Sequence, residues 1–220
     1  MKLYITRHGK TQWNIEGKFQ GALDSPLVAS GIEDANALHH YLLNEHFDCV
    51  YTSPLGRAKT TCELIFKDRG IKIQEDARLM EMNFGVFEGM KTQDIIRRYE
   101  ELYDNLWNHP EKFTRCPNHG ESFMEVRARI ESFIHDISNL PSNSKVFIVT
   151  HGMYFVCLLA YFKGYELKDY PKINRYIVRG CSLTIVDIDK DTYQIECVGD
   201  DHYLKKEAQD TFLIKQKDVA

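Results

Sequence analysis

The sequence predicts an α/β fold with three layers, in which helices lie on both faces of a mostly parallel central sheet. Short apolar and β-branched runs, of which residues 145–150 are the clearest, alternate with segments whose apolar residues recur at helical spacing. Several of these runs lead straight into polar residues with glycine or proline, as strands do where they enter a turn. Since right-handed crossovers bring the carboxyl ends of parallel strands to one edge, we expect a ligand to bind there.

The composition of the chain narrows the class of protein. With 220 residues, of which 43% are hydrophobic and 27% charged, the chain is long enough for one large domain with a substantial core. A net charge of -4 disfavours a general nucleic-acid or membrane-surface binder. No segment approaches the roughly 18 apolar residues of a membrane span, and the first apolar run is too short for a secretory signal. We therefore expect a cytoplasmic protein with neither nucleic acid nor membrane as a partner.

Six cysteines are spread along the chain without a CxxC pair. Most of them lie among apolar neighbours, which is typical of reduced core residues. A structural zinc site would need paired ligands at short spacing, so we predict none.

The first strand is predicted at Leu3 to Ile5, and it leads into Arg7, His8 and Gly9. Glycine lets the backbone come close to a ligand, and the arginine offers a planar fork of donors that suits phosphate or carboxylate. The histidine between them could be a nucleophile, a base or a ligand. By itself, such a pair at a strand end is also typical of an ordinary surface.

Residues 10–28 are predicted to form a loop over this first turn. Asn14 and Gln20 could supply donors from this loop, and Gly21 is one of its breakers. The alternative for Asn14 is an Asx-type turn that holds its own backbone. The sequence Ser30-Gly31-Ile32-Glu33 then matches a capping box and predicts a helix to about residue 45.

The second strand is predicted at Asp48 to Thr52, and the serine and proline that follow predict a helix with Ser53 as its N-cap. Arg57 falls in the first turn of this helix, where the helix dipole stabilises an anion. As a lone residue, it would be a solvent-facing arginine. After a short strand predicted at residues 72–74, Glu81 stands between two methionines. Because burial disfavours a charged carboxylate, Glu81 is a candidate general acid, with a salt bridge to a nearby arginine such as Arg78 as the alternative.

The stretch from Gly89 to about Pro117 is predicted to be helical and is rich in aromatic residues. Because it lies between two segments that carry candidate site residues, we predict that it caps the site and selects the substrate. Ordinary core packing is the alternative for such an aromatic stripe. A second long helix is predicted to follow Ser122.

The strand predicted at residues 145–150 leads into His151 and Gly152, followed by an apolar helix. His151 therefore occupies the same kind of turn as His8. Near the end of the chain we predict one strand at residues 182–187 and another at residues 193–198, joined by a turn at residues 189–191. A polar tail is predicted from about residue 200 onwards.

Four cationic or potentially cationic side chains, Arg7, His8, Arg57 and His151, follow three different predicted strands by a few residues. Folding should bring them to the same edge of the sheet. Like charges gather around an anion, so in a chain of net negative charge we predict a phosphate-sized dianion as substrate. Glu81 would supply the proton donor that this cluster lacks.

Five motifs occur in order along the chain: TRHGKTQWN, TSPLGRAKTT, RLMEMNFGVFEG, HGES and VTHG. They resemble the motifs of the histidine phosphatase superfamily, also called the phosphoglycerate mutase-like family, from Leu3 to about Val198. This resemblance implies the three-layer fold with a helical cap insertion. It also implies catalysis without a metal or other cofactor, through a histidine that is phosphorylated during turnover. We predict one domain over residues 1–220, with residues 84–118 as the insertion.

Carried over by position, the resemblance makes His8 the nucleophile and Glu81 the general acid. The residues that would contact the phosphoryl group are Arg7, Asn14, Gln20, Gly21, Arg57, Glu81, His151 and Gly152. The substrate would be a small phosphate ester, and the protein would be a monomer or a homodimer.

The segment after the candidate acid separates the branches of this family. A sequence similar to ERHYG suggests a mutase, whereas Glu81 to Gly85 followed by Phe87-Glu88-Gly89 resembles the phosphatase branch. We therefore predict hydrolysis of a phosphomonoester. A phosphoglycerate mutase, a non-catalytic module that binds a phospho-ligand and a metalloenzyme with two histidine ligands are the alternatives. Lys10 and Arg179 depart from the family pattern and suggest a substrate with a second anionic group.

Overall fold

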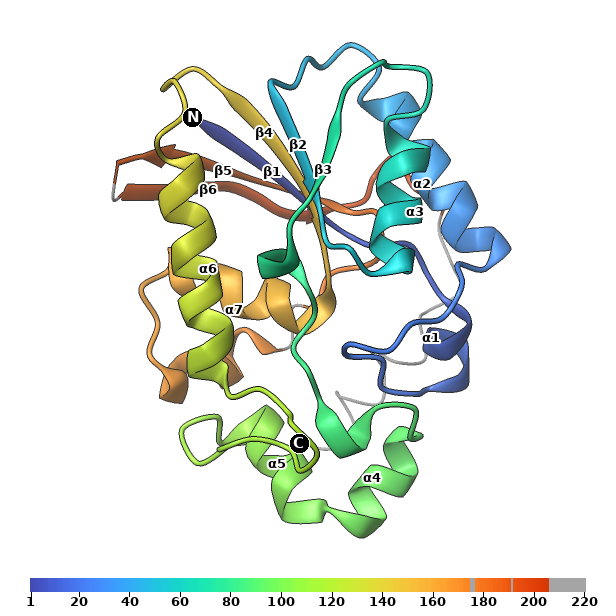
Figure 1. The fold of residues 1–220 in the computed structure, drawn as a ribbon, viewed down its shortest axis with the longest axis vertical. Helices are drawn as coiled ribbons and strands as arrows, with labels where there is room; N and C mark the ends of the chain where they lie inside the picture. The colour runs from blue at the N-terminus through green and yellow to red at the C-terminus, as the bar shows by residue number, and fades with distance from the viewer. Residues whose placement is uncertain (175–176, 191, 206–220) are drawn as a thin grey trace.

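The computed structural model describes residues 1–174, 177–190 and 192–205. Its strands are β1 (Lys2–Arg7), β2 (Cys49–Thr52), β3 (Ile73–Glu75), β4 (Lys145–Thr150), β5 (Leu183–Asp189) and β6 (Thr192–Asp200). They form one sheet in the order β3-β2-β4-β1-β5-β6 (Figure 1). The first four strands in this order pair in parallel, and β5 and β6 pair antiparallel at the other side. The predicted mostly parallel α/β sheet is confirmed.

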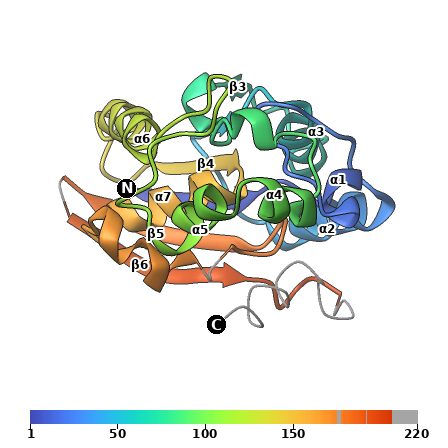
Figure 2. The same ribbon diagram turned by 90° about the horizontal axis from the view of Figure 1, so that it is seen from below.

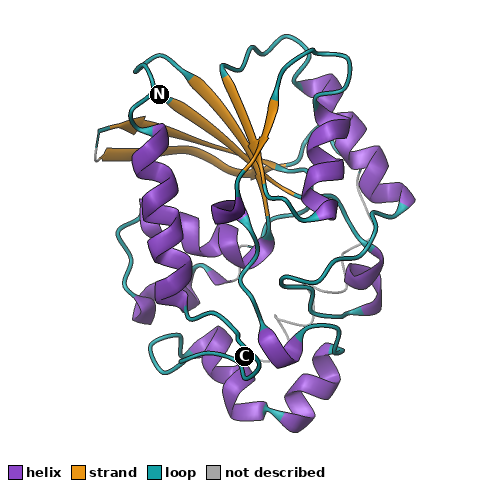
Figure 3. Cartoon of the chain, in the orientation of Figure 1, coloured by secondary structure: helices purple, strands orange, loops and turns teal. Residues whose placement is uncertain are grey.

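Helices lie on both sides of this sheet (Figure 3). The α-helices are α1 (Gln12–Glu16), α2 (Ala29–Tyr41), α3 (Gly56–Ile65), α4 (Thr92–Arg98), α5 (Glu100–Asn108), α6 (Phe123–Ile137) and α7 (Gly152–Phe162). In the described part of the chain, the short 3-10 helices are η1 (Ala77–Leu79), η2 (Gly85–Phe87) and η3 (Leu167–Lys172). Alternate residues of a strand face opposite sides. Leu3 and Ile5 of β1 accordingly join the core formed with α6 and α7, whereas Tyr4 joins the core formed with α2 and α3.

The pairing of β1 with β4 places the two candidate histidines next to each other. Arg7 is the register partner of Thr150, and the backbone N–H of His8 donates to the carbonyl of Thr150 at 2.9 Å. Parallel pairing means that both chains leave the sheet in the same direction. His8 and His151 therefore start from the same level of the sheet edge.

Two helix starts differ from the sequence prediction. Helix α2 begins at Ala29 with Val28 as its N-cap, so the capping box predicted from Ser30 is wrong. The backbone N–H of Val28 donates to the carbonyl of Lys10, and a Cβ on Gly31 would collide with that same carbonyl. A tertiary contact, rather than a local cap, therefore determines where α2 starts.

Helix α3 begins at Gly56 with Leu55 as its N-cap, two residues after the predicted start. The predicted loop over residues 10–28 contains the short helix α1, whose capping box pairs Thr11 with Asn14. The predicted helical stretch after Gly89 forms α4 and α5 and ends at Asn108. One turn residue, 191, and the predicted tail from 206 to 220 lie outside the described residues.

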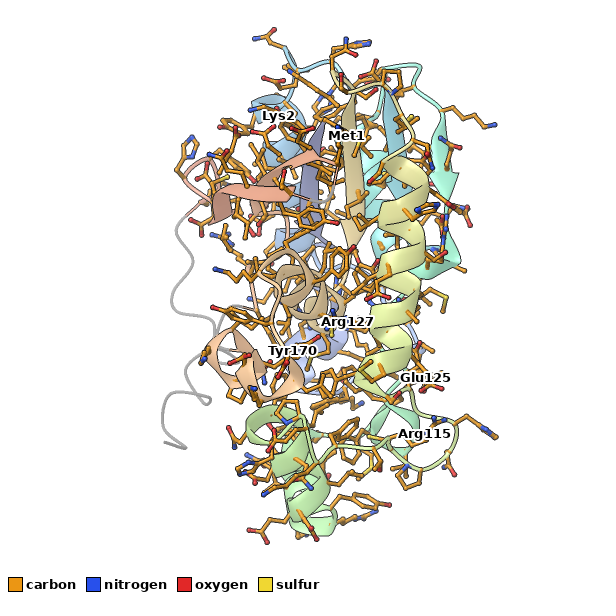
Figure 4. The ribbon with its side chains drawn as sticks, turned by 90° about the vertical axis from the view of Figure 1, so that its left-hand side faces the viewer. Met1, Lys2, Arg115, Glu125, Arg127 and Tyr170 are labelled. Atoms are coloured by element: carbon orange, nitrogen blue, oxygen red, sulfur yellow. The ribbon has the colours of Figure 1, made fainter. Side chains whose placement is uncertain are left out.

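Helices α4 and α5 lie at the end of the molecule towards which β1 and β4 run (Figures 1 and 2). The chain that returns from them to α6 is fastened by an ion pair of 3.1 Å between Arg115 and Glu125, which lie together at the lower end of α6 (Figure 4). The role of residues 84–118 as a cap stays a prediction. Among the described residues, we find no helix with the length and apolar character needed to cross a membrane.

Candidate active site

His8 follows β1 directly, and only 3% of its surface is exposed. Its Nδ1 lies 2.8 Å from the backbone carbonyl oxygen of Gly9. A carbonyl can only accept, so this contact puts the ring proton of the neutral imidazole on Nδ1. The lone pair then lies on Nε2, which is the nitrogen that could attack an electrophile.

The turn after His8 is held by close backbone packing. A Cβ on Gly9 would lie 2.7 Å from the carbonyl oxygen of Gly31, which is too close for any other residue. The N–H of Gly9 donates to Thr61 Oγ1 at 3.0 Å, and this hydroxyl donates to the carbonyl of Arg57 at 2.7 Å. Thr61, which the sequence analysis did not single out, thereby ties the His8 turn to helix α3.

Arg57 points into the protein from the first turn of α3, with 2% exposure, so the solvent-facing alternative for this residue is wrong. Its Nε donates to His8 Nε2 at 3.3 Å. Its terminal nitrogens donate to the carbonyls of Gly21 and Leu23, each at 2.7 Å, and to Asp24 Oδ1 at 2.9 Å. The guanidinium group is therefore fixed in one orientation beside the candidate nucleophile.

The loop that accepts these bonds is itself held by Glu88. The Glu88 carboxylate accepts from the N–H groups of Ala22 at 2.9 Å, Leu23 at 3.1 Å and Phe84 at 2.9 Å. Gly21 has a φ of +56°, and a Cβ there would collide with the same carboxylate. Glu88, predicted only as part of a family motif, fastens the loop that orients the arginine.

His151 follows β4, is completely buried and caps the N-terminus of α7. Its Nε2 lies 2.7 Å from Ser53 Oγ. Within the described residues, its Nδ1 is buried and has no hydrogen-bond partner. The centres of the His8 and His151 rings are 5.2 Å apart.

Arg7 lies against the start of α7. Its NH1 donates to the carbonyl of Val178 at 3.1 Å. A Cβ built on Gly152 would lie 3.6 Å from Arg7 Nε, so the predicted site residue Gly152 is an immediate neighbour of the guanidinium group.

The pKa of His8 lies well below its ordinary value of 6.5 because the ring is buried and because Arg57 and Arg7 are close. The pKa of His151 is also lowered well below 6.5, first by burial and then by Arg57 and other cationic neighbours. Both imidazoles are therefore neutral near pH 7. Neutral imidazole is the nucleophilic form of histidine.

Glu81 lies against the first turn of α7. Its Oε1 accepts from the N–H groups of Met82 and Tyr154, each at 2.9 Å, and its Oε2 accepts from the N–H of Met153 at 3.1 Å. These donors hold the carboxylate next to the helix that His151 caps. The suggested pairing of Glu81 with Arg78 is wrong, because Arg78 forms its ion pairs with two aspartates, Asp76 and Asp136.

The segment that carries Glu81 is clamped from α6 by Arg129. Its NH1 donates to the carbonyls of Arg78 at 2.8 Å and Met80 at 2.6 Å, and its NH2 donates to the carbonyl of Glu81 at 3.2 Å. Glu121 pairs with the same guanidinium group at 2.9 Å. The backbone of the candidate acid is thus fixed independently of the arginine beside His8.

A comparison with known protein families identifies the family of this chain. Residues 3–201 match the family described as the histidine phosphatase superfamily (branch 1). The chain belongs to this superfamily. It is 32% identical over 216 residues to a "Probable phosphoglycerate mutase GpmB" of Yersinia enterocolitica, across 96% of this chain and 98% of that protein.

Two solved structures are similar to this histidine phosphatase family enzyme. One, "Bacillus stearothermophilus YhfR", is 34% identical with a TM-score of 0.86, and the match covers 93% of this chain and 99% of that one. The alpha-ribazole phosphatase from Shigella flexneri is 30% identical with a TM-score of 0.78, and the match covers 90% and 96% of the two chains. The proteins similar to this chain therefore include one named as a mutase and one named as a phosphatase.

Two residues predicted as donors in this member of the superfamily use their side-chain oxygens as acceptors in other contacts. Asn14 Oδ1 accepts from the N–H and the hydroxyl of Thr11, each at 3.0 Å, which is the local capping role weighed as its alternative. Gln20 is buried, and its Oε1 accepts from Ser25 Oγ at 3.3 Å. Their contacts with a phosphoryl group stay predictions.

The two departures from the family pattern are Lys10 and Arg179. Arg179 NH2 forms two contacts with the Asp34 carboxylate, at 3.0 and 3.1 Å, and its NH1 donates to the carbonyl of Lys205. Its charge is thus compensated by an aspartate. The suggested second anionic group of the substrate stays a prediction.

The described part of the histidine phosphatase chain contains no group of three His, Cys, Asp or Glu side chains arranged to hold a metal ion. All six cysteines are free.

Proposed function

We propose that this enzyme hydrolyses a small phosphomonoester through a phosphohistidine intermediate on His8, with Glu81 as general acid and base and without a metal ion. The observation that carries this proposal is the state of His8. Its Nδ1 is bonded to a carbonyl, its pKa is lowered by burial and by two arginines, and its Nε2 lies against Arg57. A neutral nucleophile facing a cationic group is the arrangement that attack on a phosphoryl dianion requires.

In the first step, the lone pair of His8 Nε2 attacks phosphorus, and the bond between phosphorus and the ester oxygen breaks. The protonated Glu81 carboxyl gives its proton to the departing oxygen, so an alcohol leaves rather than an alkoxide. Arg7, Arg57 and His151 hold the other phosphoryl oxygens and stabilise the charge that these carry. Because the two arginines supply the positive charge, the reaction proposed here needs none from a metal.

In the second step, water replaces the alcohol. The Glu81 carboxylate takes a proton from the water as the water oxygen attacks phosphorus, and the bond between phosphorus and His8 Nε2 breaks. Inorganic phosphate leaves, and both residues return to their starting states. Glu81 can serve both steps because its segment is fixed beside the first turn of α7.

We also propose that residues 84–118 select the alcohol part of the ester. Phe19 of the loop after α1 packs edge-on against Phe84 and Phe87, with ring centres 5.1 and 5.8 Å apart. The insertion is therefore in contact with the loop that holds Arg57. Exchanging residues 84–118 for those of a related phosphatase should change which ester is preferred.

A phosphoglycerate mutase is the second candidate, because the Yersinia relative carries that name. In a mutase, the phosphohistidine would pass its phosphoryl group to a hydroxyl of a phosphoglycerate instead of water. The two reactions share the first step and differ only in the acceptor.

The deciding experiment measures phosphate release from a panel of phosphate esters alongside interconversion of 3-phosphoglycerate, with and without 2,3-bisphosphoglycerate. We expect release from at least one ester to exceed the interconversion rate. Interconversion faster than release would establish the mutase. No phosphate release and no interconversion, with no phosphorylated protein after rapid denaturation, would contradict the phosphohistidine route.

A further inference from the structure

His151 differs from His8 in the nitrogen that is already bonded. Its Nε2 lies 2.7 Å from Ser53 Oγ, and both residues have an exposure of 0%. Its Nδ1 is buried without a hydrogen-bond partner among the described residues. Buried polar atoms are nearly always paired, so the unpaired nitrogen needs an explanation.

The contacts of Ser53 determine which way its hydroxyl points. The backbone N–H of Leu55 donates to Ser53 Oγ at 3.3 Å, so this oxygen already accepts one hydrogen bond. The hydroxyl has one proton to give. If His151 Nε2 also donated to it, the serine proton would be left unpaired in a residue that water cannot reach. With Ser53 donating to Nε2, the serine is satisfied and the donor left without a partner is the Nδ1 proton of His151, which a bound ligand could pair.

We infer that Ser53 is a positioning residue that fixes His151 in the tautomer with its proton on Nδ1, so that a neutral imidazole presents an N–H donor to the bound anion. That this anion is the phosphoryl group of an ester rests on the proposed function. The tautomer itself rests on the contacts of Ser53 and on an anion of any kind beside Nδ1.

The cationic surroundings of His151 suit an anion beside its ring. Arg57, Arg7 and Arg129 all act on its ring electrostatically. An N–H group among guanidinium groups is unfavourable unless an anion lies between them. The unpaired Nδ1 is therefore explained as a donor whose acceptor is the ligand.

The first test measures the tautomer directly, in the full chain labelled with ¹⁵N at histidine, by long-range ¹H–¹⁵N correlation at pH 7.5. The signal of His151 is identified as the one missing from the His151→Asn variant. We expect Nδ1 to carry the proton in the wild type and Nε2 to gain a large share of it in Ser53→Ala. His8, whose Nδ1 bonds to a backbone carbonyl, is the internal control and should not change.

A wild-type His151 with its proton on Nε2 would overturn the inference, and so would a Ser53→Ala spectrum identical to the wild type. If Ser53→Ala does not fold, the wild-type spectrum decides by itself, and Ser53→Thr, which keeps the hydroxyl, should retain the wild-type tautomer. These readouts need no turnover. If the wild type released phosphate from no ester, the proposed function would fail while the tautomer could still be decided.

The second test measures kcat/KM for an aryl phosphate in a double-mutant cycle. Ser53→Ala should lose about 10-fold, less than the 10²- to 10³-fold typical of removing such a donor entirely. In the His151→Asn variant, the side-chain amide nitrogen lies near the position of Nδ1, and this side chain has no tautomer to fix. Adding Ser53→Ala to this variant should lower kcat/KM by a further factor of less than about two. Equal losses in both backgrounds would show that Ser53 does not act through the His151 tautomer.

Discussion

The ends of β1 and β4 carry the same residues in the same place and use them differently. Each strand is followed directly by a histidine and a glycine, and the two strands pair in parallel. Both imidazoles are buried and neutral near pH 7. His8 is bonded through Nδ1, whereas His151 is bonded through Nε2. The comparison teaches that the ring nitrogen engaged in a hydrogen bond, and not the residue type, separates the proposed nucleophile from the proposed donor.

The two bonds also differ in origin. His8 is oriented by the carbonyl of the next residue, so its state is determined within the turn itself. His151 depends on a hydroxyl from a third segment, between β2 and α3. The tautomer of the proposed nucleophile is thus determined locally, whereas that of the second histidine depends on the assembled fold.

The largest expected effect comes from replacing each histidine in turn. His8→Ala should reduce phosphate release by at least about 10⁴-fold, because the proposed covalent intermediate forms on this residue. His151→Ala should cost about 10²- to 10³-fold, the usual effect of losing one donor to a charged transition state. Rapid denaturation during turnover should trap phosphorylated protein with His151→Ala but not with His8→Ala. The opposite pattern would exchange the two roles.

Glu81 lies on the His151 side of the site, so its replacement tests whether the leaving group departs there. Glu81→Gln should slow turnover of an alkyl phosphate by about 10³-fold, because the alkoxide needs a proton to leave. An aryl phosphate with a good leaving group should lose far less. Steady-state kcat values for the two esters give the measurement. Equal losses on both would remove Glu81 from the acid role.

Glu88 lies on the His8 side, where it fastens the loop that orients Arg57. Glu88→Gln should lower kcat/KM by about 10²-fold, as expected for a small misplacement of a phosphate-binding group. The loss should be the same for alkyl and aryl esters, since the leaving group is not involved. The Glu88→Gln variant is the matched control for Glu81→Gln, because both variants exchange a glutamate for glutamine within one segment. A loss confined to alkyl esters would contradict this assignment.

The smallest effect concerns the common property of the two histidines, their lowered pKa. In the folded protein, the pKa of each of these histidines lies below 6.5. As the pH falls below 6.5, the unfolded chain therefore binds protons on these histidines before the folded protein does. The stabilisation of the folded state is therefore complete above pH 6.5 and decreases as the pH falls, by about 1.4 kcal/mol per pH unit for each histidine. Denaturant titrations from pH 7 to 5 should show a shallower slope for His151→Asn than for the wild type. Identical slopes would mean that His151 titrates normally.

Much of the fold could be predicted because strong local signals decide it. The apolar run of β4 has the bounds predicted for it, and Arg57 lies in the first turn of a helix as expected. Arg7, His8, Arg57 and His151 could be brought together because each lies at or shortly after the carboxyl end of a strand in the parallel part of the sheet. In a parallel sheet, residues at the carboxyl ends of neighbouring strands lie close together even when they are far apart in the sequence.

What could not be predicted depends on contacts between distant segments. Ser53 followed by proline is typical of a helix start, and nothing local indicates that its hydroxyl contacts a histidine 98 residues away. Glu88 accepts a bond from a backbone N–H group 66 residues earlier. The start of α2 likewise depends on how Gly31 packs against the first turn. A serine or glutamate can bond to many kinds of partner, so its role can be assigned only when the positions of its partners in the fold are known.

The position of β4 between β1 and β2 has a consequence for how the protein is made. A growing chain leaves the ribosome with β1 and β2 long before the strand that pairs with both. Until Lys145 to Thr150 have been synthesised, those two strands have unpaired edges that invite aggregation. We therefore expect shortened chains that stop before residue 145 to depend on chaperones, and the candidate active site to be among the last parts of the nascent protein to form.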